Sequence, residues 1–124
     1  MKKIILLLCF APLLLASTCN DDDETIFCTT EAVAALNVTV RLGNSTTPTS
    51  EGITVVATDG NYTETLQVVS TTNTTFIGAF ERQGNYTITV SKDGYQTYTS
   101  GVISITRDEC HVIPELIDVA LVAN

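Results

Sequence analysis

The residues best suited to chemistry in this 124-residue chain are four cysteines and one histidine. Cys110 and His111 are adjacent, and a thiolate beside an imidazole could begin a zinc site. Zinc sites typically need four ligands, however, and the other cysteines have competing roles, described below. A hydrolase triad around His111 would need a hydroxyl and a carboxylate, and no motif in the sequence provides them. The sequence therefore predicts no catalytic residue, no metal site and no cofactor.

The first 18 residues have the composition of an export signal. Lys2 and Lys3 precede an apolar run over residues 4–15, which is shorter than the roughly 20 residues of a transmembrane helix. Small residues and then Cys19 follow. This order resembles the signal of bacterial lipoproteins, although Thr18 departs from the usual Gly or Ala before the cysteine. The resemblance implies that Cys19 is diacylated and becomes the mature N-terminus; the alternative is ordinary cleavage that leaves Cys19 as a free thiol.

Cysteine parity connects this signal to the rest of the chain. Removal of residues 1–18 would take away Cys9 and leave Cys19, Cys28 and Cys110. An odd number of cysteines in an exported chain leaves one reactive thiol. If Cys19 carries lipid, Cys28 and Cys110 can form a disulfide, which the oxidising compartment outside the inner membrane permits. Two unpaired buried cysteines are the alternative.

The chain is acidic, with 14 acidic and 6 basic residues and a net charge of −8. This charge, without a basic cluster, argues against nucleic acid and against electrostatic docking to an anionic membrane. Residues 19–27 form an expected acidic tether, which can be a solvated spacer on the periplasmic side. Residues 19–24 also resemble the acidic surface-export signal of Bacteroidota lipoproteins. That resemblance implies an outer-membrane lipoprotein whose domain is exposed on the cell surface.

From Leu36 onward, apolar and polar residues alternate with the period of two that is typical of half-buried strands. Thr and Val are frequent in these segments, and Gly, Asn and Asp lie between them. The pattern predicts one all-β domain over residues 28–124, an antiparallel β-sandwich of about seven strands. The segments from which these strands are expected to form lie within residues 36–42, 53–57, 62–68, 76–80, 86–90, 95–98, 102–105 and 111–122.

Residues 84–95, GNYTITVSKDGY, closely resemble the core motif of carboxypeptidase regulatory-like domains. Residues 52–60, GITVVATDG, resemble the strand and turn that precede it in that family. The resemblance covers about residues 34–121 and implies a seven-stranded, Greek-key, transthyretin-like (prealbumin-like) sandwich. Tyr86, Ile88 and Val90 are then expected in the core, with Tyr95 capping it. Because such modules are common accessories of exported proteins, the resemblance implies a role other than catalysis.

The sequence thus favours a lipid-anchored, non-catalytic envelope protein that binds or scaffolds another envelope protein or a glycan. A structural spacer without a ligand is one alternative, and a small hydrolase or transport component is another. Glycan binding usually needs exposed aromatic rings. The candidate residues for such a platform are Tyr62, Tyr95 and Tyr98.

Overall fold

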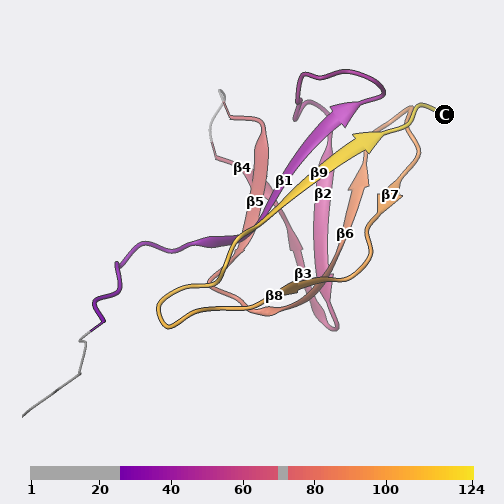
Figure 1. Ribbon diagram of the computed structural model, residues 1–124. Helices are drawn as coiled ribbons and strands as arrows, with labels where there is room; N and C mark the ends of the chain where they lie inside the picture. The colour runs from indigo at the N-terminus through magenta and orange to yellow at the C-terminus, as the bar shows by residue number, and fades with distance from the viewer. Residues whose placement is uncertain (1–25, 70–72) are drawn as a thin grey trace, which may run out of the picture.

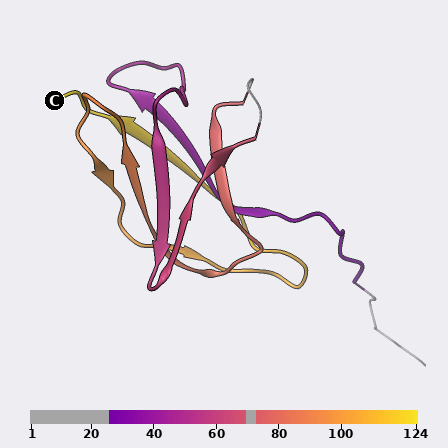
Figure 2. The same cartoon turned by 180° about the vertical axis from the view of Figure 1, so that it is seen from behind.

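The domain consists of two β-sheets packed face to face (Figures 1 and 2). The computed structural model describes residues 26–69 and 73–124, and this part of the chain contains strands and no helix. The prediction of an all-β sandwich is therefore confirmed. The first sheet has the order β4 (Gln67–Val68), β5 (Thr75–Phe80), β1 (Ala34–Leu42), β9 (Glu115–Leu121). The second has the order β3 (Tyr62–Thr65), β2 (Thr54–Asp59), β6 (Gly84–Ser91), β7 (Tyr98–Thr99), and β8 (Ile103–Ile105) also pairs with β6.

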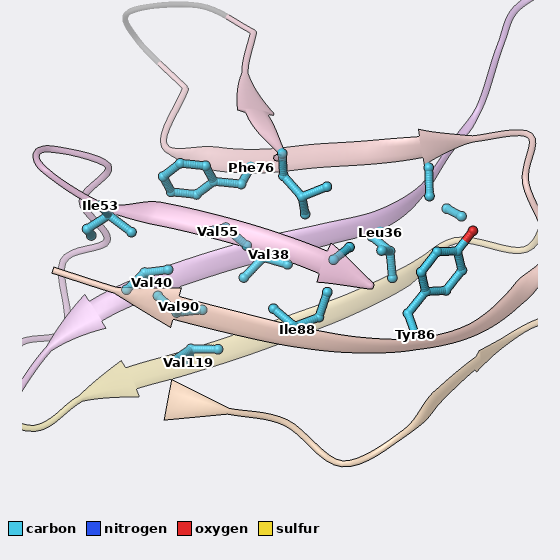
Figure 3. Packing of buried hydrophobic residues seen from close by; sticks show 14 of the residues in the cluster. Leu36, Val38, Val40, Ile53, Val55, Phe76, Tyr86, Ile88, Val90 and Val119 are labelled. Carbon is cyan, nitrogen blue, oxygen red and sulfur yellow. The ribbon is translucent and has the colours of Figure 1, made fainter. Parts of the chain in front are cut away.

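The alternation of apolar residues places one face of each long strand in the core between the sheets (Figure 3). Tyr86, Ile88 and Val90 on β6 are completely buried, as the sequence predicts. Burying one such aliphatic side chain contributes about 1.5–3 kcal/mol to stability. On β1 and β2, the completely buried residues are Ala35, Leu36, Val38, Val40, Val55 and Ala57. This core holds the two sheets together and positions the loops at both ends of the sandwich.

The expected strand over residues 62–68 is in fact two strands that belong to different sheets. β3 pairs with β2 in the second sheet, whereas β4 pairs with β5 in the first. Leu66 lies between them, with its backbone N–H donating to the Val55 carbonyl and its side chain buried in the core. Alternation shows which side chains are buried, but it does not show which neighbour a strand pairs with. The prediction of seven strands is wrong for this reason among others, because the described residues form nine.

The prediction of a wholly antiparallel sandwich is also wrong. β1 and β9 are parallel, with Leu36 beside Glu115 and Leu42 beside Leu121. Antiparallel neighbours can be joined by a tight turn, but parallel neighbours need a crossover. Here residues 106–114 cross from β8 in the second sheet to β9 in the first. Strand direction depends on this long connection, which the periodicity of the sequence does not encode.

Two expected strands are shorter than predicted. The segment 111–122 becomes β9 only at Glu115, because Pro114 has no N–H and restricts the residue before it. The segment 95–98 contributes only Tyr98 to β7, while Tyr95 makes a single antiparallel bridge with Ala123. His111 therefore lies in the crossover loop, outside any strand.

Candidate functional site

The segment before β1, residues 26–33, is tied by a covalent bond to the end of the sandwich where β1 begins. Cys28 forms a disulfide with Cys110, 82 residues later, and their Cα atoms lie 5.2 Å apart. This confirms the pairing that cysteine parity favoured. Cys110 belongs to the crossover loop, so the disulfide ties the start of the domain to the connection between its last two strands. Cys19 and the signal residues lie outside the described residues.

Glu81, in the turn between β5 and β6, fastens the same segment by hydrogen bonds. Its carboxylate accepts the Val33 N–H at 2.8 Å and the Val112 N–H at 3.1 Å, and Oε2 lies 2.6 Å from His111 Nδ1. The Glu81 N–H donates in turn to the Val33 carbonyl. The Val33 N–H, followed by the bonds from His111 and Val112, holds the pKa of Glu81 below its usual value. An ionised Glu81 thus joins three separate stretches of the chain.

A hydroxyl completes this network. Nε2 of His111 lies 2.9 Å from Thr29 Oγ1, on the side of the ring away from Glu81. In a neutral imidazole whose Nδ1 donates to Glu81, Nε2 accepts the Thr29 hydroxyl. Thr29, His111 and Glu81 therefore form a hydroxyl–imidazole–carboxylate chain, which the sequence interpretation missed. Their separation in sequence hides the group, and the only hint is that His111 follows a cysteine that bridges to Cys28.

The crossover loop around this network is itself hydrogen-bonded. Oδ1 of Asp108 accepts the backbone N–H groups of Cys110 at 2.8 Å and His111 at 2.9 Å. The bonds from the His111 and Cys110 N–H groups lower the pKa of Asp108. A surface hollow of about 620 Å³ adjoins the disulfide. It is lined by Ile26, Arg107, Asp108, Glu109 and Cys110.

Tyr62 belongs to a second cluster, at the start of β3. The Arg82 guanidinium lies 3.7 Å from the centre of its ring, and the ring of Tyr86 meets it edge-on at 6.3 Å. Arg82 also bonds Asp59 Oδ2 and the Tyr86 hydroxyl, each at 2.9 Å. The Tyr62 hydroxyl donates to Glu64 at 2.5 Å, and this bond, together with burial, raises the pKa of Tyr62 to about 12. One face of the Tyr62 ring is thus occupied by Arg82.

The structure does not bring the three candidate tyrosines together. Tyr62 lies on β3, at one edge of the second sheet and beside the start of β6. Tyr98 lies on β7, on the opposite side of β6, where it pairs with Val90 near the strand end. Tyr95 and Tyr98 both pack partly against the core. The three rings therefore form no common platform for a glycan.

The described residues contain no group of three or more His, Cys, Asp or Glu side chains placed to hold a metal ion. Within the same part of the chain, no helix is long and apolar enough to cross a membrane.

Comparison with protein-family models found no match for this chain, and comparison with curated proteins found no similar sequence.

Proposed function

We propose that this chain is a lipid-anchored module of the bacterial cell envelope that binds or scaffolds another envelope component without catalysis. Cys19 carries the lipid, residues 20–27 form a short tether, and the β-sandwich binds the other component. The signal-like residues before Cys19 and the acidic residues after it support the first two assignments.

The observation that carries this proposal is the location of the disulfide. Cys28 follows Cys19 by nine residues and is bonded to the crossover loop. The segment 26–33 therefore leaves the sandwich at the end where β1 begins. The loop 43–53 and the chain end lie at the other end (Figure 1). We expect a force applied at Cys19 to pass through the disulfide to the loop between β8 and β9, which belong to different sheets. The hydrogen bonds between β1 and its neighbours would then not carry this force alone.

The short tether limits the distance from the membrane at which the domain can bind another component. Nine residues span at most about 32 Å when fully extended. The strands add about 30 Å, since the nine residues of β1 rise about 3.3 Å each. A bound component must therefore lie within roughly 60 Å of the lipid surface. This reach suits a partner that is itself a membrane or near-membrane component.

Lipid anchoring is tested by expressing the full chain in a bacterial host fed an alkyne-bearing fatty acid. We expect label on the wild type and none on Cys19→Ala, which should leave the membrane fraction. Cys9→Ala is the matched control and should remain labelled. Label on Cys19→Ala, or an unlabelled wild type that is exported and cleaved, contradicts the anchor. Protease treatment of intact cells then distinguishes surface from periplasmic display.

The Thr29–His111–Glu81 chain favours a second candidate function, an esterase-like hydrolase. This function ranks below binding for two reasons. The three side chains also hold the segment 26–33 in place, and the Glu81 carboxylate accepts two further hydrogen bonds from backbone N–H groups. We expect the purified full chain to hydrolyse p-nitrophenyl acetate no faster than its Thr29→Ala and His111→Ala variants. Turnover that both variants lose, while they remain folded, would support the hydrolase.

A further inference from the structure

β9 is the longest strand that forms an open sheet edge in the described part of the chain. It has seven residues and lies at the end of the first sheet, with β1 on one side only. The other edge strands of the two main sheets are short: β4 has two residues, β3 has four and β7 has two. An edge of this length offers a row of unpaired backbone groups to another extended chain.

The direction of those backbone groups follows from the hydrogen bonds at the end of β9. The Leu121 carbonyl accepts the Gly43 N–H at 2.8 Å, so it faces β1. Successive residues of a strand direct their N–H and C=O groups to opposite edges. Leu116, Asp118 and Ala120 therefore direct theirs away from β1, and all three residues are exposed. None of the described residues pairs with this edge between 116 and 120.

Directly beyond this stretch, the same edge already accepts an extended segment. The Val122 carbonyl accepts the Gln96 N–H at 2.8 Å, and the Asn124 N–H donates to the Gly94 carbonyl at 3.0 Å. The bridge between Tyr95 and Ala123 is antiparallel. After Gln96 the chain turns away to join β6 as β7, leaving a hollow of about 110 Å³ beside Ala120. The internal segment thus occupies only the last part of the edge.

The open part of β9 lacks the usual protection of an edge strand. Natural edges are commonly blocked by lysine, proline or uncompensated charge. Residues 116–120 include neither lysine nor proline, and their one charged side chain, Asp118, is paired with Arg41 at 2.8 Å while 62% of it stays exposed. Leu116 is 84% exposed and borders a hollow of about 400 Å³, also lined by Thr39, Ile117 and Asp118. An apolar side chain of an added strand can pack against the exposed Leu116.

We propose that the edge of β9 at residues 116–120 binds an extended segment of another envelope protein, which adds a strand to the first sheet. The inference rests on the proposed binding function and names its surface and mode. Backbone pairing supplies affinity, and side chains at alternate positions supply specificity. The matching segment carries an apolar residue that packs against Leu116 and a basic residue near the exposed carboxylate of Asp118. A second copy fits poorly, because two chains of charge −8 repel.

The proposal is tested by photo-crosslinking in cells that carry the full, lipidated chain. A p-benzoylphenylalanine probe replaces Leu116, and a matched probe replaces Val69, which is 66% exposed beside β4 at the opposite edge of the same sheet. We expect one discrete protein adduct from position 116 and none from 69. Ala120→Pro should lower the yield at 116 at least about tenfold, because proline removes an outward N–H and blocks the edge without breaking the β1 ladder.

Two measurements keep failure of folding apart from loss of binding. The thermal midpoint of Ala120→Pro is compared with that of the wild type, and Asp118→Lys, which reverses the edge charge, serves as a second blocking variant. An adduct that survives both folded variants overturns strand addition. An adduct with a second copy of this chain overturns the choice of partner. A chain that carries lipid on Cys19 but gives no adduct at 116 refutes this surface and leaves the envelope anchor intact.

Discussion

The Nδ1 atom of His111 lies 2.6 Å from Oε2 of Glu81 and joins the crossover loop to the turn between β5 and β6. The same Glu81 carboxylate receives the N–H of Val33 at the start of the domain. Together with the disulfide, this contact makes the end of the sandwich where β1 begins a single connected unit. The charge of Glu81 and the Cys28–Cys110 disulfide can each be removed by substitution without changing the other.

Glu81 should make stability depend on pH in the acid range. The folded state holds the pKa of Glu81 below its usual value of 4.5. Ionisation of Glu81 therefore stabilises the folded state relative to the unfolded chain. This contribution is present above about pH 4.5 and is lost as the pH falls through the lower, folded pKa. Asp108 in the adjoining loop acts in the same direction. Thermal midpoints recorded from pH 7 to pH 2 should therefore decrease in the acid range.

Glu81→Gln should lower the midpoint at pH 7 and make it less dependent on pH below 4.5. Glu31→Gln is the control, because Glu31 is an exposed carboxylate within the segment 26–33. A Glu81→Gln variant with the wild-type pH profile would contradict the role given to Glu81.

The Cys28–Cys110 disulfide should contribute about 4 kcal/mol to the free energy of unfolding, on the chain-entropy account of a loop of this length. The double variant Cys28→Ser/Cys110→Ser should show this loss in urea denaturation. Its segment 26–33 should also be cut faster by protease. Restoring only one cysteine should recover neither property, and an unchanged urea midpoint in the double variant would show that the disulfide adds no stability.

Tyr62 should ionise at a higher pH than a free tyrosine side chain. Its hydrogen bond to Glu64 raises its pKa to about 12 from 10.0, so the neutral phenol is favoured by folding. That stability is fully present below pH 10 and is lost as the pH rises toward 12. Phenolate absorbance should show one group ionising near pH 12, and Glu64→Gln should move that transition downward. The assignment is wrong if Tyr62→Phe leaves this late transition in place.

Gly78 in β5 should not tolerate a side chain. A Cβ atom there would overlap Leu66 Cδ2 and lie 2.8 Å from Glu64 Oε2. Gly78→Ala should destabilise the domain by about 1–3 kcal/mol, as overpacking of a buried site does. Gly101→Ala is the matched control, since a Cβ there has no atom within 4 Å. Equal urea midpoints for the two variants would show that β5 can shift to make room.

Much of the fold follows from local pattern. Alternation along residues 36–40 and 86–90 places Leu36, Val38, Tyr86, Ile88 and Val90 in the core, because a strand with one buried face repeats every two residues. The Cys28–Cys110 bond follows from counting cysteines in a chain expected to be exported. These features need no knowledge of which strands are neighbours.

The sequence by itself determined the all-β class, the buried face of the main strands and the cysteine pair. The tertiary structure alone decided the change of sheet at Leu66, the parallel pairing of β1 with β9, the meeting of Thr29 with His111 and Glu81, and the open edge at residues 116–120. The physical reason is that periodicity records only whether a side chain faces the core. Pairing, strand direction and contacts between distant residues depend on how the loops cross between the sheets, and no short stretch of sequence contains that information.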